Sequence, residues 1–299
     1  MAQQIPISDE SVAFDPDMDS VRHDHTHEVA SDLAYRRLGL VNVVFVGAAG
    51  AADRNWVLID AGLLGTAPLI RDAARARFGE DSRPAAILMT HGHFDHVGAL
   101  EQLAEDWDVP VFAHPLERPY LDGSASYPPG DPTVGGGLMA ALARLYPRKP
   151  VDVAQRLQDL PSDGSVPFLA GWRWVHTPGH SVGHVSFWRE SDRTLIAGDA
   201  VVTTAQESAY AVAVQEPELH GPPMYFTVNW PDAEESVAQL ADLQPDLLMT
   251  MHGQPLHGAE MREGLHRLAK DFGDLSVPRQ GRYLTEPRRA QDGSAYELS

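Results

Sequence analysis

Short apolar runs separated by glycine-containing turns occupy the chain from residue 29 to residue 59. The runs cover residues 29–38, 41–46 and 56–59. Runs of this length, rich in branched apolar side chains and bounded by turn residues, are typical of β-strands. The pattern therefore predicts antiparallel strands, the third of which ends in a tight turn at residues 60–62.

Beyond residue 60, helical periodicity alternates with further short apolar runs. Thr66 is a candidate N-cap for a helix that ends near Phe78, with Gly79 at its C-terminal cap. Strands followed by helix–strand units, twice over, suit two mixed sheets packed together with helices outside. The remaining predicted elements are strands at 85–89, 109–113, 172–177, 185–188, 194–197 and 246–250, and helices at 97–106, 232–243 and 258–272.

Two irregular stretches interrupt this order. Residues 115–150 contain seven prolines and a run of three glycines, and residues 203–230 are rich in aromatic residues and proline. Long irregular segments inside a compact domain often carry function, so we expect both to be insertions that cover a site. A short helix is expected near residues 138–146. The predicted organisation is a polar N-terminal arm at 1–28, one domain at 29–275 and a polar, arginine-rich tail at 276–299.

The chain has 299 residues, a formal net charge of −19 and no cysteine. The negative charge argues against non-specific binding to nucleic acid, which needs a basic face, and against docking on an anionic membrane. Without cysteine, any metal must be held by histidine and carboxylate side chains. The N-terminal residues lack an apolar core, and no run approaches the length of a membrane span, so we expect a cytoplasmic protein.

The pattern with the most specific chemistry is the segment THGHFDH at residues 90–96, directly after the apolar run at 85–89. It places three imidazoles and one carboxylate within six residues at the end of a predicted buried strand. Folding alone needs no such cluster, whereas zinc, manganese and iron are bound by histidine and carboxylate ligands. The spacing can supply ligands to two ions. A hydrolytic enzyme with two metal ions is therefore the leading hypothesis.

Three further candidate ligands each follow a predicted strand. They are His180 in TPGHSVGH, Asp199 in AGDA and His252 in MHG. Strand ends in α/β folds are where ligands and catalytic groups gather. Glycine beside each candidate lets the backbone turn sharply and approach an ion closely. Together with residues 90–96, these strand ends predict one composite metal site.

The four motifs, in this order and at these separations, resemble those of the metallo-β-lactamase fold superfamily over residues 29–270. The resemblance implies an α/β fold, a four-layer αββα sandwich of two mixed β-sheets flanked by helices. It also implies two divalent ions, Zn²⁺ first and Mn²⁺ or Fe²⁺ as alternatives, with a bridging hydroxide that attacks the substrate and is oriented by Asp95 as the catalytic residue. One ion would be held by His91, His93 and His180, the other by Asp95, His96 and His252, and Asp199 would bridge both.

The presence of Asp199 bears on which bond is cleaved. In the resemblance, true β-lactamases usually carry cysteine or serine there, whereas glyoxalase II-like thioesterases, acyl-homoserine-lactone lactonases and tRNA-processing phosphodiesterases carry aspartate. The negative charge disfavours tRNA, and the 47 residues after His252 are few for the C-terminal domain of glyoxalase II-like enzymes. We expect a hydrolase of a small ester, thioester or lactone, from the glyoxalase II-like or lactonase-like branch. Open alternatives are a β-lactamase, a phosphodiesterase, a mononuclear iron sulfur-dioxygenase and non-enzymatic metal binding.

The insertions supply candidate substrate contacts. Aromatic residues there are expected to wall a mostly apolar pocket, with Tyr225 and Phe226 as substrate-binding candidates. His114, which follows the strand at 109–113, is a third candidate, with a structural role as the alternative. His184 lies four residues after His180 and is expected to pack beside the ligands without binding metal.

The alternating histidines His23, His25 and His27 lie in the N-terminal arm. We expect a solvated arm there, with an accessory metal site as the alternative. The expected partner is a small-molecule substrate, with no nucleic acid and no membrane. Soluble enzymes commonly form symmetric dimers, so a homodimer is a further expectation, although the sequence carries no interface signal.

Overall fold

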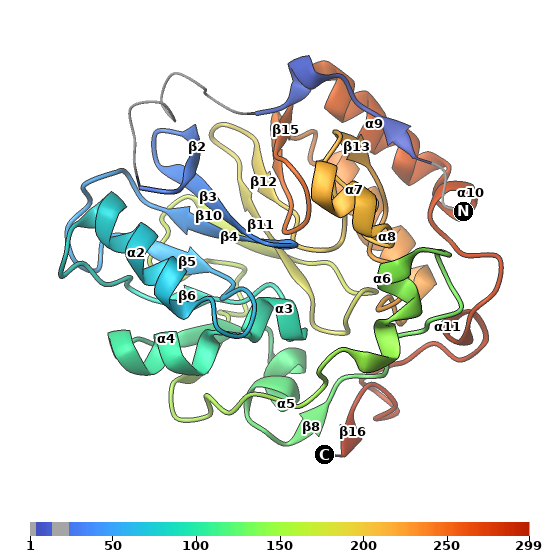
Figure 1. The fold of residues 1–299 in the computed structure, drawn as a ribbon, viewed down its shortest axis with the longest axis horizontal. Helices are drawn as coiled ribbons and strands as arrows, with labels where there is room; N and C mark the ends of the chain where they lie inside the picture. The colour runs from blue at the N-terminus through green and yellow to red at the C-terminus, as the bar shows by residue number, and fades with distance from the viewer. Residues whose placement is uncertain (1–3, 14–23, 299) are drawn as a thin grey trace.

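Two β-sheets, one built from each half of the chain, face each other between outer layers of helices (Figure 1). The computed structural model describes residues 4–13 and 24–298. Phe45 and Leu58 of the first sheet share a buried core with Phe187 and Ile196 of the second. The four-layer αββα sandwich of two mixed sheets expected from the sequence is therefore confirmed.

The first sheet contains seven strands in the order β2-β3-β4-β5-β6-β7-β9. Strands β2 to β5 are antiparallel, as predicted, but the run at residues 29–38, predicted as one strand, is divided between β2 and β3 by a turn at residues 31–32. Strands β5, β6, β7 and β9 are parallel. The edge strand β9 was not expected, because exposed Gln158 and Asp159 give it no apolar pattern. The strands are β2 (His27–Ala30), β3 (Leu33–Leu38), β4 (Val41–Val46), β5 (Val57–Ile59), β6 (Ile87–Leu88), β7 (Val111–Ala113) and β9 (Leu157–Asp159).

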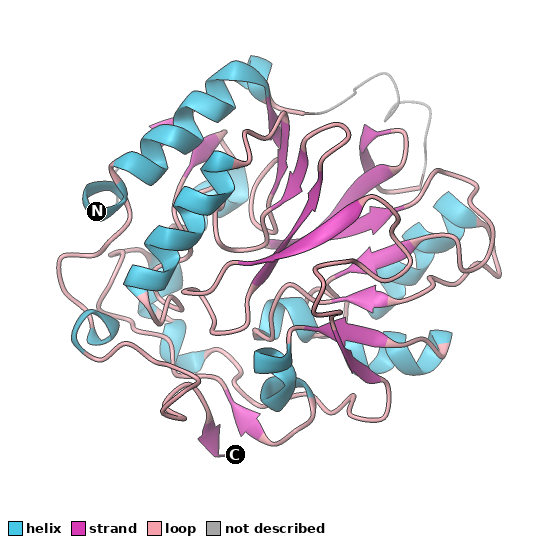
Figure 2. Cartoon of the chain, turned by 180° about the vertical axis from the view of Figure 1, so that it is seen from behind, coloured by secondary structure: helices cyan, strands magenta, loops and turns pink. Residues whose placement is uncertain are grey.

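The second sheet has the order β10-β11-β12-β14-β15, and only β12 and β14 pair in parallel. Its outer face packs against two long helices that lie side by side (Figure 2). Leu195 and Leu248 of the sheet share a buried core there with Leu240 and Leu265 of the helices. These elements are β10 (Trp172–His176), β11 (Val185–Arg189), β12 (Thr194–Ile196), β14 (Leu247–Met249), β15 (Leu256–His257), α8 (Trp230–Asp242) and α9 (Gly258–Lys270), and the short α10 (Phe272–Leu275) follows α9.

The helices of the first half differ from the prediction in two details. Helix α2 (Ala67–Phe78) follows Thr66, but the Thr66 hydroxyl donates to the Leu63 carbonyl and does not cap the helix. The single helix predicted at residues 97–106 is two helices, α3 (Phe94–Val97) and α4 (Leu100–Trp107). The break lies at Gly98, whose N–H donates to the Gly62 carbonyl at 2.7 Å.

The two irregular stretches contain short elements that lie against each other. The helix predicted near residues 138–146 is present as two short turns, and the Met139 N–H donates to the Glu207 carbonyl. The first stretch contains η2 (Pro115–Glu117), α5 (Arg118–Leu121), β8 (Ala125–Ser126), α6 (Leu138–Ala141) and η3 (Ala143–Leu145). The second contains α7 (Ala209–Val214) and β13 (Glu218–Leu219).

The N-terminal segment departs from the solvated arm that was expected. Residues 4–13 include β1 (Ile5–Pro6), which pairs with β13, and η1 (Asp9–Ser11). Asp24 and Glu28 are buried, and their charge is compensated because their carboxylates lie 3.7 and 2.9 Å from the buried guanidinium of Arg77. His25 is exposed and His27 is partly buried, while His23 lies outside the described residues.

The C-terminal residues return to the domain surface. They form α11 (Arg282–Thr285) and β16 (Glu297–Leu298), and β16 pairs with β8 of the first stretch. Tyr283 is buried, and the Ala295 carbonyl accepts a hydrogen bond from the Tyr120 hydroxyl at 2.8 Å. Across residues 4–13 and 24–298, no helix has both the length and the apolar character needed to span a membrane.

Candidate metal centre

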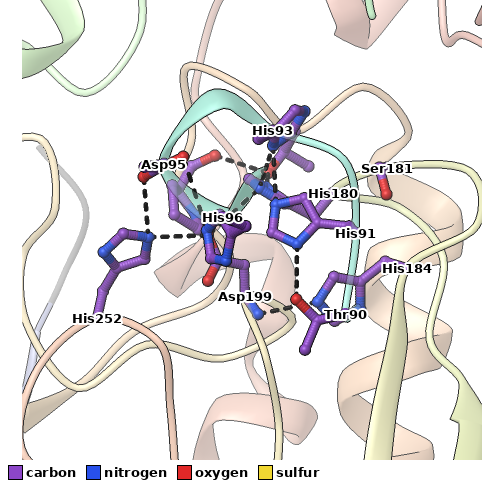
Figure 3. Close-up of polar contacts among 12 residues, drawn as sticks. Thr90, His91, His93, Asp95, His96, His180, Ser181, His184, Asp199 and His252 are labelled. Atoms are coloured by element: carbon purple, nitrogen blue, oxygen red, sulfur yellow. Dashed lines mark hydrogen bonds and ion pairs between the residues drawn. The ribbon is translucent and has the colours of Figure 1, made fainter. Parts of the chain in front are cut away.

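Four loops at the carboxyl ends of strands bring seven histidine and aspartate side chains together (Figure 3). The loop after β6 and helix α3 carry four of them, and the loops after β10, β12 and β14 carry one each. All seven are at most 5% exposed. Their ligand atoms form three overlapping groups, in each of which the atoms lie within 4.8 Å of one another. The groups are His91, His93 and His180; His91, His96 and Asp199; and Asp95, His96 and His252.

The three histidines of the first group direct one ring nitrogen each toward the same point. His93 Nδ1 lies 3.0 Å from His91 Nε2 and 2.9 Å from His180 Nε2. Burial lowers the pKa of His91 and His93 well below the usual value and that of His180 to about 3. The three rings are therefore neutral at pH 7. Neutral imidazole nitrogens are the form in which histidine binds metal ions.

The Asp199 carboxylate lies where the ligand groups overlap. Its Oδ2 atom is 3.4 Å from His180 Nε2, 3.5 Å from His96 Nε2 and 3.0 Å from His252 Nε2. Asp95 closes the other side, with its Oδ1 atom 3.7 Å from His96 Nε2 and its Oδ2 atom 3.5 Å from His252 Nε2. One carboxylate thus reaches histidines of both ligand sets that the sequence resemblance implied.

The electrostatics around Asp199 call for positive charge. Burial by itself would raise the pKa of Asp199, but His252 and His96 outweigh it and lower the pKa well below the usual range. Burial would likewise lower the pKa of His96, yet three neighbouring carboxylates, Asp199 first among them, raise it well above the usual value. A buried carboxylate therefore stays ionised here only with a compensating cation beside it.

Hydrogen bonds outside the ligand set fix which ring nitrogen faces the centre. Asp60, at the end of β5, accepts from His96 Nδ1 at 2.8 Å and from the Thr90 N–H and hydroxyl at 2.8 and 2.7 Å. The Leu40 carbonyl accepts from His252 Nδ1 at 2.7 Å. Because both acceptors hold a proton on Nδ1, Nε2 is the atom by which each ring faces the centre and would bind an ion. The sequence prediction placed Asp60 only in a turn.

Two buried atoms at the centre test whether a metal ion fits. Within the described part of the chain, His96 Nε2 and Asp199 Oδ1 are buried and have no hydrogen-bond partner. Buried polar atoms are nearly always paired, so two unpaired ones at one centre indicate a missing partner. The donors are imidazole nitrogens and carboxylate oxygens, a set that suits zinc, manganese or iron. The residues present therefore fit a metal ion.

His184 lies beside the ligands and does not face the centre. Its Nε2 atom accepts from the Asp199 backbone N–H at 2.9 Å, and its Nδ1 atom lies 2.8 Å from the Thr177 hydroxyl. Gly198 has φ +62°, and a Cβ there would lie 2.4 Å from His184 Nε2. His184 therefore holds the Asp199 loop, in agreement with the packing role expected from the sequence.

The predicted substrate contacts from the second insertion lie next to the centre. The Phe226 ring is 4.8 Å from the His93 ring, and the Tyr225 ring lies 5.0 Å from the Phe226 ring at an interplanar angle of 59°. Tyr127 of the first insertion lies 4.5 Å from His93 on another side. Both insertions thus cover the His93 side of the centre.

The third candidate contact, His114, makes different contacts. Its ring stacks on His176 at 4.3 Å and lies 5.5 Å from Trp174. Its Nδ1 atom accepts the Leu116 N–H at 3.2 Å. These contacts support the structural alternative for His114 and give no support to a role in substrate binding.

Comparison with known proteins agrees with this geometry. The sequence model of the metallo-beta-lactamase superfamily matches residues 36–252. The chain is 46% identical over 256 residues to the probable metallo-hydrolase YflN of Bacillus subtilis strain 168. The matched region covers 86% of this chain and 97% of that protein. It is 31% identical over 173 residues to the probable metallo-hydrolase YybB of the same organism, covering 58% of this chain and 66% of that protein.

Solved structures share the fold. A beta-lactamase domain protein from Burkholderia ambifaria matches with a TM-score of 0.58 and 21% identity, covering 90% of this chain and 78% of that chain. The family model spans most of the domain, and the identity to YflN extends over nearly all of that relative. The chain therefore belongs to the metallo-beta-lactamase superfamily.

Proposed function

We propose that the chain is a hydrolase with two divalent metal ions that cleaves a small ester, thioester or lactone. The observation that carries this proposal is the position of Asp199, whose Oδ2 atom lies 3.0–3.5 Å from Nε2 atoms of His180, His96 and His252. An aspartate at this place can serve both ions, which favours the thioesterase-like and lactonase-like members of the superfamily. Two relatives named as probable metallo-hydrolases support the hydrolytic reaction.

The seven buried ligands would hold the ions, and other residues would orient them. When bound, two divalent ions lower the pKa of a shared water and polarise the bond under attack. Asp60 and the Leu40 carbonyl keep the protons of His96 and His252 on Nδ1, away from the reacting atoms. Asp95, the most exposed of the seven ligands at 5%, is the proposed catalytic residue. Its carboxylate accepts a hydrogen bond from the attacking water and orients it.

An aromatic wall beside the centre supports an apolar substrate. Phe94 stacks on Tyr146 at 5.1 Å, and the Tyr146 ring lies 5.9 Å from both Tyr225 and Phe226. Such rings offer broad apolar faces, and a tyrosine hydroxyl such as that of Tyr225 can hydrogen-bond a substrate oxygen. We therefore propose Tyr225 and Phe226 as substrate contacts, with the apolar acyl part of the substrate against this wall.

A substrate panel tests the proposal. Metal-free protein would be loaded with Zn²⁺, Mn²⁺ or Fe²⁺ and assayed against p-nitrophenyl esters, thioesters, lactones, a bis-phosphodiester and a cephalosporin. We expect turnover of an ester, thioester or lactone that is lost with a chelator and restored by metal, and lost in Asp95→Asn. Turnover confined to the phosphodiester or the cephalosporin would overturn the assigned bond class. Unchanged turnover in Asp95→Asn would overturn the role of Asp95.

A further inference from the structure

A buried carboxylate outside the ligand set ties together the two loops that carry the three-histidine group. Glu117, the last residue of η2, is completely buried. Its Oε2 atom accepts the Gly92 N–H at 2.8 Å, and its Oε1 atom accepts the Ser181 hydroxyl at 2.8 Å and the Gly183 N–H at 2.7 Å. All three partners are donors, and an ionised carboxylate is an acceptor only, so the match is complete.

The donors to Glu117 lie next to metal-ligand candidates in the sequence. Gly92 separates His91 from His93, and Ser181 directly follows His180. Figure 3 shows Ser181 on the His180 side of the centre, opposite His252. One carboxylate therefore connects the loop after β6 with the loop after β10, which together supply the three-histidine group.

The backbone around Glu117 packs closely against both loops. A Cβ on Gly92 would lie 2.9 Å from Tyr120 Cβ, and a Cβ on Gly183 would lie 2.8 Å from the Glu117 backbone nitrogen. Both distances are shorter than side-chain contacts allow, so both loops need glycine at these positions. The segment from η2 to α5 therefore packs tightly against both loops, and the Glu117 carboxylate hydrogen-bonds to both.

We propose that Glu117 is a positioning residue that sets the spacing of His91, His93 and His180 and thereby the metal affinity of that group. This inference rests on the proposed function only in that it requires the centre to bind metal. Outer hydrogen bonds that orient metal ligands typically change metal affinity by about 10–100-fold when they are removed. None of the three donors to Glu117 belongs to the neighbouring group of Asp95, His96 and His252. The metal affinity of that group is therefore expected to change little.

The substitution Glu117→Gln isolates this role, because it keeps the shape of the side chain. One amide oxygen can still face the Ser181 hydroxyl and the Gly183 N–H. The amide NH₂ must then face the Gly92 N–H, which places donor against donor. A buried donor without an acceptor is costly, so the loop between His91 and His93 is expected to move.

The test uses Co²⁺ titrated into metal-free full-length protein, followed by d–d absorption and by competition with a chromophoric chelator. Burial raises the pKa of Glu117 to about 7, so the titration is run at pH 8, where the carboxylate is ionised. The variant His180→Ala identifies the binding step that belongs to the three-histidine group. We expect Glu117→Gln to weaken that step by about 10–100-fold and to change its absorption spectrum, with the other step nearly unchanged.

A matched control separates positioning from general stability. Asp24 is also a buried carboxylate; it accepts the Thr26 N–H and hydroxyl at 2.9 and 2.6 Å and pairs with Arg77 of α2, outside the four ligand loops. Asp24→Asn should lower the melting temperature without moving either Co²⁺ step. If Glu117→Gln also lowered only the melting temperature, with both steps and the spectrum as in the wild type, the proposal would be overturned.

A second variant covers the case in which Glu117→Gln does not fold. Ser181→Ala removes one donor and leaves two backbone N–H groups on the carboxylate, so the same Co²⁺ step should weaken by a smaller factor. No change in that step would overturn the proposal. If the wild type bound two Co²⁺ ions yet cleaved nothing in the substrate panel, the proposed hydrolase function would be overturned. The Co²⁺ affinities of the variants would still decide the role of Glu117. A wild type that binds no Co²⁺ would overturn both.

Discussion

At the scale of single residues, the centre depends on side chains that hold the ligands as much as on the ligands. Asp60 has φ +59°, a left-handed conformation that aspartate and asparagine tolerate better than most residues. That conformation turns its carboxylate back toward Thr90 and His96, where it accepts three hydrogen bonds. Asp60 thereby links the end of β5 to the ligand loop after β6.

Asp60→Asn is expected to weaken metal binding by about 10–100-fold with only a small change in the fold, because asparagine suits the same backbone conformation. The carboxylate uses one oxygen for the Thr90 N–H and the other for the Thr90 hydroxyl and His96 Nδ1, whereas the amide has only one acceptor oxygen. At least one of these donors then faces the amide NH₂, so the contacts that orient the His96 ring are disturbed. Chelator competition measures the affinity. The surface carboxylate Asp53, which pairs with Arg83, offers the control Asp53→Asn. Wild-type affinity in Asp60→Asn would show that His96 is oriented by other contacts.

The ligands were predictable from sequence, whereas the residues that hold them were not. His91, His180 and His252 each follow an apolar strand and stand beside glycine, so their chemistry and their position agree. Asp60 before alanine and glycine is indistinguishable from an ordinary turn residue. Glu117 stands among prolines in a stretch without periodicity, and only the folded chain brings it to Gly92 and Ser181.

At the scale of elements, the helix predicted at residues 97–106 is two helices, and the first of them positions Asp95 and His96. Helix α3 carries Asp95 and His96, and Gly98 allows it to pack directly on the turn that follows β5. Periodicity could not reveal the break, because Leu100 and Leu103 continue a regular buried face. The short strand β9 was missed because its exposed residues carry no apolar pattern, although the main strands and helices were predicted within a few residues.

Gly98→Ala is expected to destabilise the protein by about 2–3 kcal/mol, in the range found for overpacked cores. A Cβ there would lie 2.1 Å from the Leu64 backbone nitrogen and 2.7 Å from the Gly62 carbonyl oxygen. Chemical denaturation measures the loss. Gly273→Ala in α10 is the control, because no described atom outside its immediate neighbours lies within 4 Å of the added Cβ. Equal stabilities of the two variants would contradict the close packing of α3.

At the scale of the whole molecule, the two halves are joined outside the metal centre as well. His114 follows β7 of the first sheet and His176 ends β10 of the second, and their rings stack 4.3 Å apart at an interplanar angle of 9°. The N-terminal and C-terminal segments also pack on the domain. Their polar composition predicted an arm and a tail. The structure differs because composition alone cannot show that Asp24 and Glu28 compensate a buried arginine.

The stacked pair should make folding stability depend on pH. Burial, and then the neighbouring His176, lower the pKa of His114 to about 4, below the value near 6.5 that histidine has in an unfolded chain. As the pH falls below 6.5, the unfolded state takes up the proton first. The stabilisation is therefore complete above pH 6.5 and is lost progressively toward pH 4. Because solvent screens the partly exposed ring, the loss stays below the one-proton limit of about 1.4 kcal/mol per pH unit.

His114→Asn should flatten this slope, because asparagine keeps an acceptor for the Leu116 N–H and carries no titrating group. Urea denaturation of the metal-free protein between pH 8 and pH 4 measures the free energy of unfolding for both proteins. At pH 8 the difference in unfolding free energy between the two proteins reports packing alone. The change in that difference at lower pH therefore reports the protonation of His114. Parallel pH profiles for wild type and variant would contradict this assignment.

The metal content of the purified protein tests the central claim most directly. Elemental analysis after dialysis should give about two divalent ions per chain, as a two-metal hydrolytic site requires. The triple variant His23→Ala, His25→Ala and His27→Ala removes any ion held by the N-terminal histidines and should keep both. One ion or none per chain in the triple variant, after reloading with excess Zn²⁺, would contradict the two-metal centre.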